Sequence, residues 1–251
     1  MRPLAGYGGN ALIKITMLLV RKPGMSREEF QDYWLNVHGP LVMSMPEIKR
    51  HVVKYVQSHT LSDWFPFLVG DGPLYDGAAE IWCDSLEEVQ AMFAEPRVAD
   101  EVYPDELNFL DLDKIIVLVM NEHLIYQRPG ADIHGGVKLF EVPVRKQGMT
   151  RAQCHRHWLE VHGPMVLNSP EMIAPMRRYV QSHSLEEPVS GIPPMPYEGL
   201  AELWFGSKED LLESFGDQYM ERVHPDEPNF ADLHKCTAFA AREYVIYERG
   251  G

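Results

Sequence analysis

The sequence is poor in cysteine: Cys83, Cys154 and Cys236 are the three cysteines among 251 residues. Their number is odd and no pair has CxxC spacing, which argues against a disulfide framework and against a zinc site. We interpret them as buried reduced thiols. The apolar run ALIKITMLLV is short, contains Lys14 and has no small-residue cleavage pattern. It therefore predicts a strand rather than a signal peptide or a membrane span, and we expect a cytoplasmic protein.

Basic residues are also scarce, because 23 lysines and arginines stand against 37 acidic residues, for a formal net charge of −14. They form no run or stripe. An acidic surface repels phosphate backbones and anionic lipid headgroups, so we expect neither nucleic acid nor a membrane as a partner. The sequence has no glycine-rich phosphate loop, no GxSxG elbow and no HExxH spacing. We therefore expect no metal and no covalent nucleophile.

What the sequence does contain is an internal repeat. The pentapeptide YVQSH occurs at 55–59 and at 179–183, and the segments 34–59 and 158–183 align without gaps, with 14 of 26 positions identical. Residues 20–30, 75–82 and 104–114 match 144–154, 197–204 and 225–235 in the same order. A period of roughly 120 residues is that of a domain and is too long for a solenoid unit. The Pro/Gly-rich stretch 127–136 separates the copies, so we divide the chain into domains 1–130 and 131–251.

Each copy predicts the order strand, helix, strand, strand, helix, strand. In the first copy the strands are expected at 13–20, 51–59, 77–82 and 114–120. The helices begin at capping sequences that start at Ser26 and Ser85, and the first helix is expected to end at the helix-breaking pair Gly39-Pro40. This βαββαβ order is that of a ferredoxin-like α+β unit with both helices on one face of an antiparallel sheet. We predict that the two fused units form one intramolecular αβ barrel around a pseudo-twofold axis.

The repeat acts as a filter for functional histidines. Of eleven histidines, only two positions carry histidine in both copies: His38 with His162, and His59 with His183. His38 and His162 precede Gly-Pro at the expected end of a helix, where the negative end of the helix dipole favours protonated imidazole. This histidine either transfers protons or caps the turn, and both interpretations stay open.

A polar stripe follows the strand that contains YVQSH. Strand alternation places Tyr55, Gln57 and His59 on one face, and the second copy repeats this pattern. A polar stripe on an interior strand is costly unless it is hydrogen-bonded or lines a cavity. Tyrosine and imidazole are proton-transfer groups, which favours a pocket, and a hydrogen-bonded core network is the alternative. The candidate catalytic residues are therefore His38, His162, Tyr55, His59, Tyr179 and His183.

Other side chains are weaker candidates. The candidate substrate-binding residues are Gln57 and Gln181 of the stripe, Trp64 and Phe65 of the aromatic insert 63–70, and Glu80 and Glu202 in short apolar strands. The two glutamates either orient a histidine or pair with a lysine or arginine. The motif PDE-x-NF is expected to build a turn through Asp105 and Asn108. The seven histidines without a counterpart, His155 and His157 among them, are interpreted as surface or loop residues without a role.

The segments KPGMSREEFQDYWLNVHGPLV, YVQSH, YDGAAEIW and DELNFLD together resemble the EthD family, within the dimeric αβ-barrel superfamily. The resemblance covers nearly the whole chain, twice over. It implies that a barrel normally built by two chains is built here by one. It also implies that the histidine of the HGP motif and the Tyr/His strand line the pocket.

What the resemblance implies about function is a cofactor-independent lyase. Such an enzyme would be a decarboxylase or dehydratase acting on an aromatic or polycyclic phenolic acid, by His/Tyr proton transfer in a barrel pocket. The insert 63–70 has no aromatic counterpart in the second copy, so the two pockets are expected to differ. The alternatives are a cofactor-free monooxygenase or isomerase of aromatic catabolism, and a non-catalytic binder of small hydrophobic ligands or of haem. Besides the small aromatic substrate, a homodimer of the fused chain stays open as a partner.

Overall fold

The computed structural model describes residues 12–61, 74–193 and 195–250. Trp64 and Phe65, which the sequence suggests as substrate-binding residues, lie outside the described residues. Within these ranges no helix combines the length and the apolar character needed to cross a membrane.

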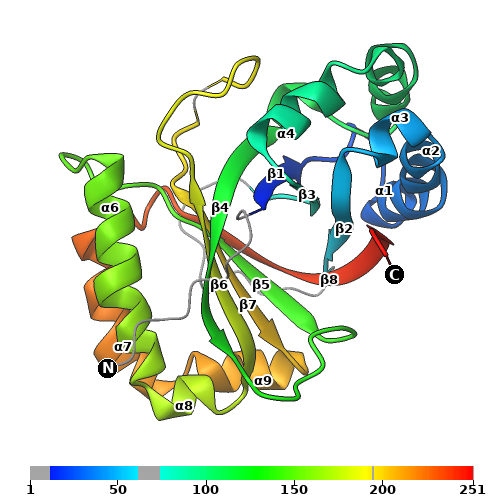
Figure 1. Cartoon of the computed structure of the whole chain (residues 1–251). Helices are drawn as coiled ribbons and strands as arrows, with labels where there is room; N and C mark the ends of the chain where they lie inside the picture. The colour runs from blue at the N-terminus through cyan, green and yellow to red at the C-terminus, as the bar shows by residue number, and fades with distance from the viewer. Residues whose placement is uncertain (1–11, 62–73, 194, 251) are drawn as a thin grey trace.

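Eight antiparallel strands close into one barrel (Figure 1). Around the barrel they follow the order β1 (Ile13–Leu19), β3 (Gly77–Cys83), β2 (Val52–Thr60), β8 (Thr237–Glu248), β5 (Val137–Val142), β7 (Gly199–Phe205), β6 (Met176–Ser184) and β4 (Ile116–Gln127). The two ferredoxin-like units meet where β2 pairs with β8 and where β4 pairs with β6. The predicted fused α+β barrel is therefore confirmed. The division at residue 130 falls between β4 and β5 and stays a prediction.

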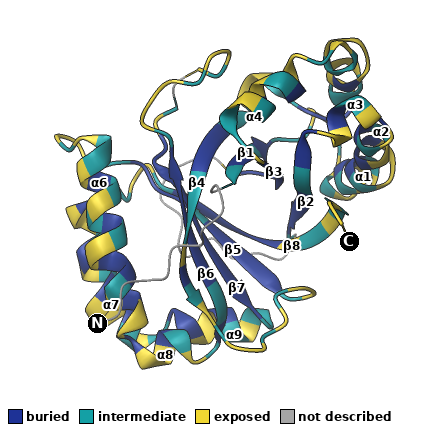
Figure 2. Ribbon diagram, in the orientation of Figure 1, coloured by how far each residue is buried: buried dark blue, intermediate teal, exposed yellow. Residues whose placement is uncertain are grey.

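Helices cover the outside of the barrel, with those of the two units on opposite sides (Figure 1). The first unit contributes α1 (Arg27–Tyr33), η1 (Trp34–His38), α2 (Gly39–Met43), α3 (Pro46–Lys49), α4 (Leu86–Phe93), η2 (Val98–Val102), α5 (Tyr103–Glu106) and η3 (Leu112–Lys114). The second contributes α6 (Arg151–His157), η4 (Trp158–His162), α7 (Gly163–Leu167), α8 (Pro170–Ile173), α9 (Lys208–Ser214), η5 (Tyr219–Val223) and η6 (His224–Asn229). The capping box predicted at Ser26 is present, since its hydroxyl accepts the Glu29 N–H while the Glu29 carboxylate accepts the Ser26 N–H. Figure 2 shows the strands buried and the outer helix faces exposed.

The first helix does not end at Gly39-Pro40, contrary to the sequence prediction. The chain widens into one π-helical turn, η1, in which the Gly39 N–H donates to the carbonyl of Trp34, and it continues as α2. Proline has no N–H and its ring clashes with the carbonyl four residues back in a regular α-helix. A π turn changes the hydrogen-bonding register at that point, so Pro40 enters as an early residue of α2 instead of stopping the helix.

A glutamine of the YVQSH stripe holds each π turn against the sheet. Gln57 Nε2 donates to the Trp34 carbonyl at 3.0 Å and to the Tyr55 hydroxyl at 3.0 Å. Gln181 Nε2 donates in the same way to the Trp158 carbonyl at 3.1 Å and to a tyrosine hydroxyl at 2.9 Å. A Cβ on Gly39 would stand 2.7 Å from Gln57 Nε2, so the close approach of helix and glutamine requires glycine there.

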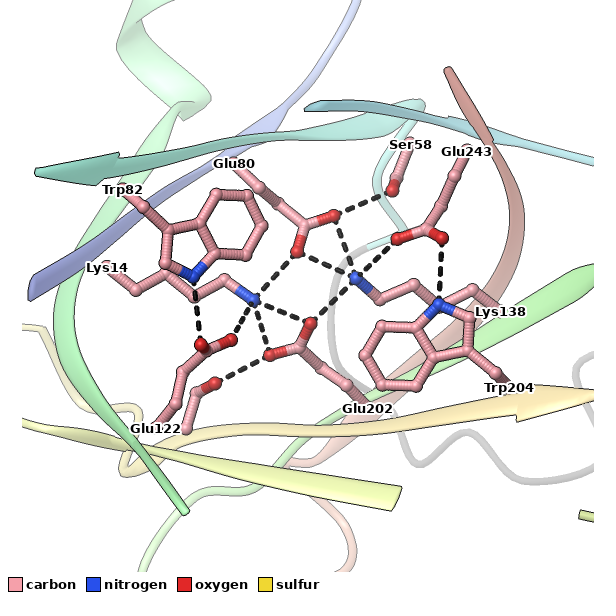
Figure 3. Close-up of polar contacts among 10 residues, drawn as sticks. Lys14, Ser58, Glu80, Trp82, Glu122, Lys138, Glu202, Trp204 and Glu243 are labelled. Atoms are coloured by element: carbon pink, nitrogen blue, oxygen red, sulfur yellow. Dashed lines mark hydrogen bonds and ion pairs between the residues drawn. The ribbon is translucent and has the colours of Figure 1, made fainter. Parts of the chain in front are cut away.

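Charged side chains of both units meet in the barrel interior (Figure 3), and a buried apolar cluster that includes Leu118, Phe140 and Phe239 packs there as well. In the described residues this part of the interior is occupied by side chains, which corrects the expectation of a pocket inside the barrel. Lys14 Nζ contacts Glu202 Oε1 at 2.6 Å and Glu80 Oε2 at 2.7 Å. Lys138 Nζ contacts an oxygen of each of the same two glutamates at 2.7 Å. All four side chains are fully or almost fully buried. Glu80 and Glu202 therefore pair with lysines, one of the two alternatives that the sequence leaves open.

Outer groups complete this Lys–Glu cluster, which we define as Lys14, Glu80, Lys138 and Glu202. Ser58 Oγ donates to Glu80 at 2.7 Å and Ser182 Oγ donates to Glu202 at 2.6 Å. The two lysines also contact Glu122 and Glu243, each at the partly exposed edge of the cluster. Burial opposes charge on Lys14, but the carboxylates of Glu202 and Glu80 outweigh it and raise the pKa of this lysine.

Removal of one lysine from the cluster should destabilise the whole barrel. We expect Lys14→Met to lower the free energy of unfolding by about 3–5 kcal/mol, because it leaves buried carboxylate charge without its counter-ion. Urea unfolding followed by circular dichroism measures the change. The control is Lys235→Met, since Lys235 is exposed and pairs only with its near neighbour Asp232. Equal stability losses in the two variants would contradict the proposed role of the cluster.

A second prediction concerns Gln57 and Gln181, the glutamines that hold the two π turns. We expect Gln57→Leu and Gln181→Leu each to cost about 1–3 kcal/mol of unfolding free energy, since each removes a buried donor from two acceptors. Gln127→Leu serves as the control because Gln127 is exposed and donates only a 3.4 Å hydrogen bond to the Arg128 carbonyl. If thermal and urea unfolding find both buried variants as stable as the control, the glutamines do not anchor the π turns.

Candidate active site

The YVQSH stripe faces the helices and is fully engaged in contacts with them. His59 stacks on Trp34 with ring centroids 4.5 Å apart, and its Nε2 is 3.0 Å from Gln57 Oε1. His183 stacks on Trp158 at 4.7 Å and contacts Gln181 Oε1 at 3.1 Å. These contacts are those of a hydrogen-bonded network within each unit. The catalytic role predicted for the stripe stays a prediction.

Burial makes the stripe a poor source of protons at neutral pH. It raises the pKa of the Tyr55 hydroxyl to about 12 and lowers the pKa of His59 to about 4. Burial, together with the nearby imidazoles of His155 and His123, lowers the pKa of His183 still further. The imidazoles are therefore neutral and the phenol keeps its proton, which suits an anchor better than an acid.

The histidines of the HGP motif form carboxylate–imidazole dyads. His38 Nδ1 lies 2.7 Å from Asp105 Oδ2, and His162 Nδ1 lies 3.2 Å from Asp226 Oδ2. A carboxylate accepts the proton of Nδ1 and so leaves the lone pair on Nε2. His38 is not at a helix end, because α2 follows, and burial outweighs Asp105 and lowers the pKa of His38. The expectation that a helix dipole keeps this imidazole protonated is therefore wrong.

The aspartates of these dyads were missed as functional residues. The sequence prediction gave the PDE-x-NF motif only a local turn, yet Asp105 also accepts a hydrogen bond from the Tyr33 hydroxyl at 2.7 Å. Asp226 accepts one from His157 Nε2 at 2.9 Å. His157 is therefore hydrogen-bonded to the dyad, and its interpretation as a residue without a functional role stays a prediction. The sequence signal for these aspartates is that Asp105 and Asp226 occupy corresponding positions in both copies.

His155 is engaged as well. Its ring centroid lies 4.4 Å from that of His183, and its Nε2 lies 2.8 Å from the Glu198 carbonyl oxygen. His155 is not among the candidate catalytic residues because the first copy has Gln31 at the corresponding position.

A cavity of about 370 Å³ lies between the sheet and the helices of the second unit. Strand β5 and the elements η4, η5 and η6 contribute to its wall. Its larger apolar side chains are Trp158, Phe215, Met220 and Phe230. Its ionisable side chains are Glu141, His162, Tyr219, His224, Glu227, His234 and Cys236. His162 is the candidate catalytic residue that reaches this cavity, and Gln181 and His183 contact the cavity residue Trp158.

Three of the ionisable groups form a hydrogen-bonded triad in the wall. The Tyr219 hydroxyl donates to Glu227 Oε1 at 2.8 Å, and His224 Nδ1 lies 2.9 Å from Glu227 Oε2. Burial and the two carboxylates Glu227 and Glu141 raise the pKa of the Tyr219 hydroxyl, which therefore stays protonated. Both oxygens of the Glu227 carboxylate are thus occupied.

The first unit has other residue types at the positions of Glu141, Tyr219 and His224. In the register of the repeat, Met17 corresponds to Glu141 and Val98 to Tyr219, the first residues of η2 and η5. Tyr103 corresponds to His224 in the same register. The dyad of the first unit therefore has no matching acidic group on its strand. A comparison that keeps only residues shared by both copies cannot identify these residues of the second unit.

Comparison with known proteins agrees with this architecture. The EthD domain model matches residues 22–113 and 146–234. The dehydratase aurZ of Gibberella zeae is 25% identical over 44% of this chain and 76% of its own length. The dehydratase ustZ of Ustilaginoidea virens is 30% identical over 43% of this chain and 81% of its own. The decarboxylase claH of Passalora fulva is 27% identical over 39% and 67%.

Solved structures share the fold across the whole chain. An anthrone oxidase-like protein matches with a TM-score of 0.67 and covers 96% of both chains at 10% sequence identity. At that identity the match describes the fold alone. The family model covers both repeats, and each repeat supplies the motifs that carry it. The chain therefore belongs to the EthD domain family, with two EthD units in one barrel.

Proposed function

We propose that this chain is a lyase that eliminates water or carbon dioxide from an aromatic phenolic substrate bound in the cavity of the second unit. Three relatives that match about one unit of this chain are named as two dehydratases and a decarboxylase. Both kinds of enzyme are lyases, which supports this reaction class. The observation that carries the proposal is the dyad of His162 and Asp226, whose imidazole forms part of the cavity wall.

The cavity suits a flat apolar molecule. Its volume is within the range of small-molecule sites, and aromatic rings dominate the apolar part of its wall. Trp158 and Phe230 offer ring faces to a polycyclic substrate, and the Tyr219 hydroxyl and the imidazoles offer hydrogen bonds to its oxygens. Ring systems of two or three fused rings are the substrates expected to fit.

The dyad supports proton transfer at carbon. Asp226 fixes the tautomer of His162, so Nε2 carries a lone pair that can accept a proton from carbon as water leaves. In a decarboxylation the same atom, once protonated, delivers its proton to the carbon that has lost carbon dioxide. In both cases the apolar wall excludes bulk water from the carbanion-like centre. No redox step is involved.

We expect His162→Ala to lower kcat by about 10²–10⁴-fold, the usual contribution of a positioned acid–base group. Two probes yield the same fluorescent product, 1-naphthol: 3-hydroxy-1-tetralone by loss of water and 1-hydroxy-2-naphthoic acid by loss of carbon dioxide. The matched variant is His38→Ala in the first unit, for which we expect a smaller loss of kcat. A larger loss in His38→Ala would place the reaction in the other unit.

The same assay separates the lyase from an oxygenase. An oxygen electrode in the reaction vessel should record no uptake that matches 1-naphthol formation. Uptake in proportion to turnover would contradict elimination. Binding of 1-naphthol without turnover of either probe would instead describe a ligand-binding protein.

A further inference from the structure

One ionisable group in the cavity has no role in the dyad. Glu141 lies on β5, where Ala201 of β7 and Ala238 of β8 are its neighbours across the sheet. These small side chains leave the carboxyl open to the cavity that Glu141 helps to line. Among the described residues its carboxyl makes no hydrogen bond and no ion pair. Its side chain is partly exposed, so a molecule in the cavity can reach the carboxyl.

The surroundings of Glu141 favour its protonated form. No lysine or arginine lines this cavity, as far as the structure describes the chain. The neighbouring carboxylate, Glu227, is occupied by Tyr219 and His224 and offers it no compensating cation. Burial, and next the charge of Glu227, raise the pKa of Glu141 to about 8. At neutral pH its carboxyl therefore retains a proton that it can give to a ligand.

The cavity thus holds a base and an acid with separate environments. His162 has its Nδ1 proton bound to Asp226 and a lone pair on Nε2, whereas Glu141 has a proton and no acceptor. A proton acceptor and a proton donor that line one cavity can act together on one bound molecule. An elimination of water needs both functions, since one bond to hydrogen and one bond to oxygen break.

We propose that Glu141 is the general acid that protonates the departing oxygen of an uncharged, hydroxylated substrate while His162 removes a proton from the adjacent carbon. This inference rests on the proposed function and specifies its second catalytic group. The C–H electron pair becomes the new C=C bond, and the C–O bond breaks as its oxygen takes the Glu141 proton and leaves as water. His162 ends protonated and Glu141 ionised. Transfer of one proton from the imidazolium to the carboxylate, through solvent, restores both.

The position of Glu141 also explains why the second unit is the catalytic one. Its counterpart Met17 has no proton to give, although the first unit has its own dyad of His38 and Asp105. The first unit therefore has no carboxyl at the position of Glu141, although burial and the charge of Asp105 raise the pKa of its Glu106 to about 7. A carboxylate substrate would moreover face two glutamates and no cationic side chain in the second unit. Elimination of water from a neutral molecule is the reaction that this wall favours.

The test uses the full chain and 3-hydroxy-1-tetralone as the probe. We expect Glu141→Gln to lower kcat by about 10²–10⁴-fold with KM changed by only a few-fold, since the amide fills the same space but donates no acidic proton. Glu141→Asp should restore part of the rate. In the unmodified chain kcat should fall as the pH rises through about 8, as Glu141 loses its proton, and this fall should be absent in Glu141→Gln.

The matched control is Met17→Gln, which puts the same amide at the corresponding position of the first unit and should leave kcat within about twofold. Urea unfolding verifies that each variant is folded. Wild-type kcat and an unchanged pH profile in Glu141→Gln, with turnover still dependent on His162, would overturn the role of Glu141 and leave the lyase intact. If the unmodified chain turns over neither the tetralone nor 1-hydroxy-2-naphthoic acid, the proposed function fails, and the role of Glu141 with it.

Discussion

The architecture depends on two lysines and two glutamates that share the centre of the barrel and are shielded from bulk solvent. Ions in a low-dielectric interior are tolerated only when each charge is paired and its hydrogen bonds are satisfied. Lys14 reaches Glu202 of the other unit, and Lys138 reaches Glu80 in return. A shift of one sheet against the other would break all of these contacts together. The cluster thus selects one register of the two units, at the cost of any ligand space on the barrel axis.

Because the cluster occupies the barrel axis, a substrate has to bind elsewhere. With the centre of the barrel occupied, the cavity of the second unit lies on the outer face of the sheet, under the helices, and there the π turn η4 positions His162. Each π turn exists because Gly-Pro must be accommodated in a continuing helix, and because a buried glutamine donates to its carbonyl. The HGP motif, which predicts a helix end from the sequence, therefore orients the imidazole of His38 or His162 toward the sheet. π turns of this kind are frequent at functional sites.

The fold could be predicted from the sequence because its signals are repeated and local. Capping boxes, strand periodicity and the two copies all indicate the same βαββαβ unit. The site could be predicted only in part, for physical reasons. Asp105 and Glu106 are adjacent in a turn motif, and no local pattern reveals that one of them reaches back to His38. Glu141 lies in an apolar strand, where a single carboxylate has no signature until the cavity around it is seen.

Many of the residues that both units share have structural roles, whereas some residues found in one unit only are not needed for the fold. The shared glutamines, tryptophans and lysines sit where both halves need the same anchor or the same counter-ion. Met17 and Glu141, at corresponding positions of β1 and β5, meet no such demand and are free to differ. Two identical chains around a true twofold axis must carry the same residue at both sites. Fusion removes that restriction, so one unit can gain a carboxylic acid while the other keeps a methionine and serves as the support for its partner's sheet.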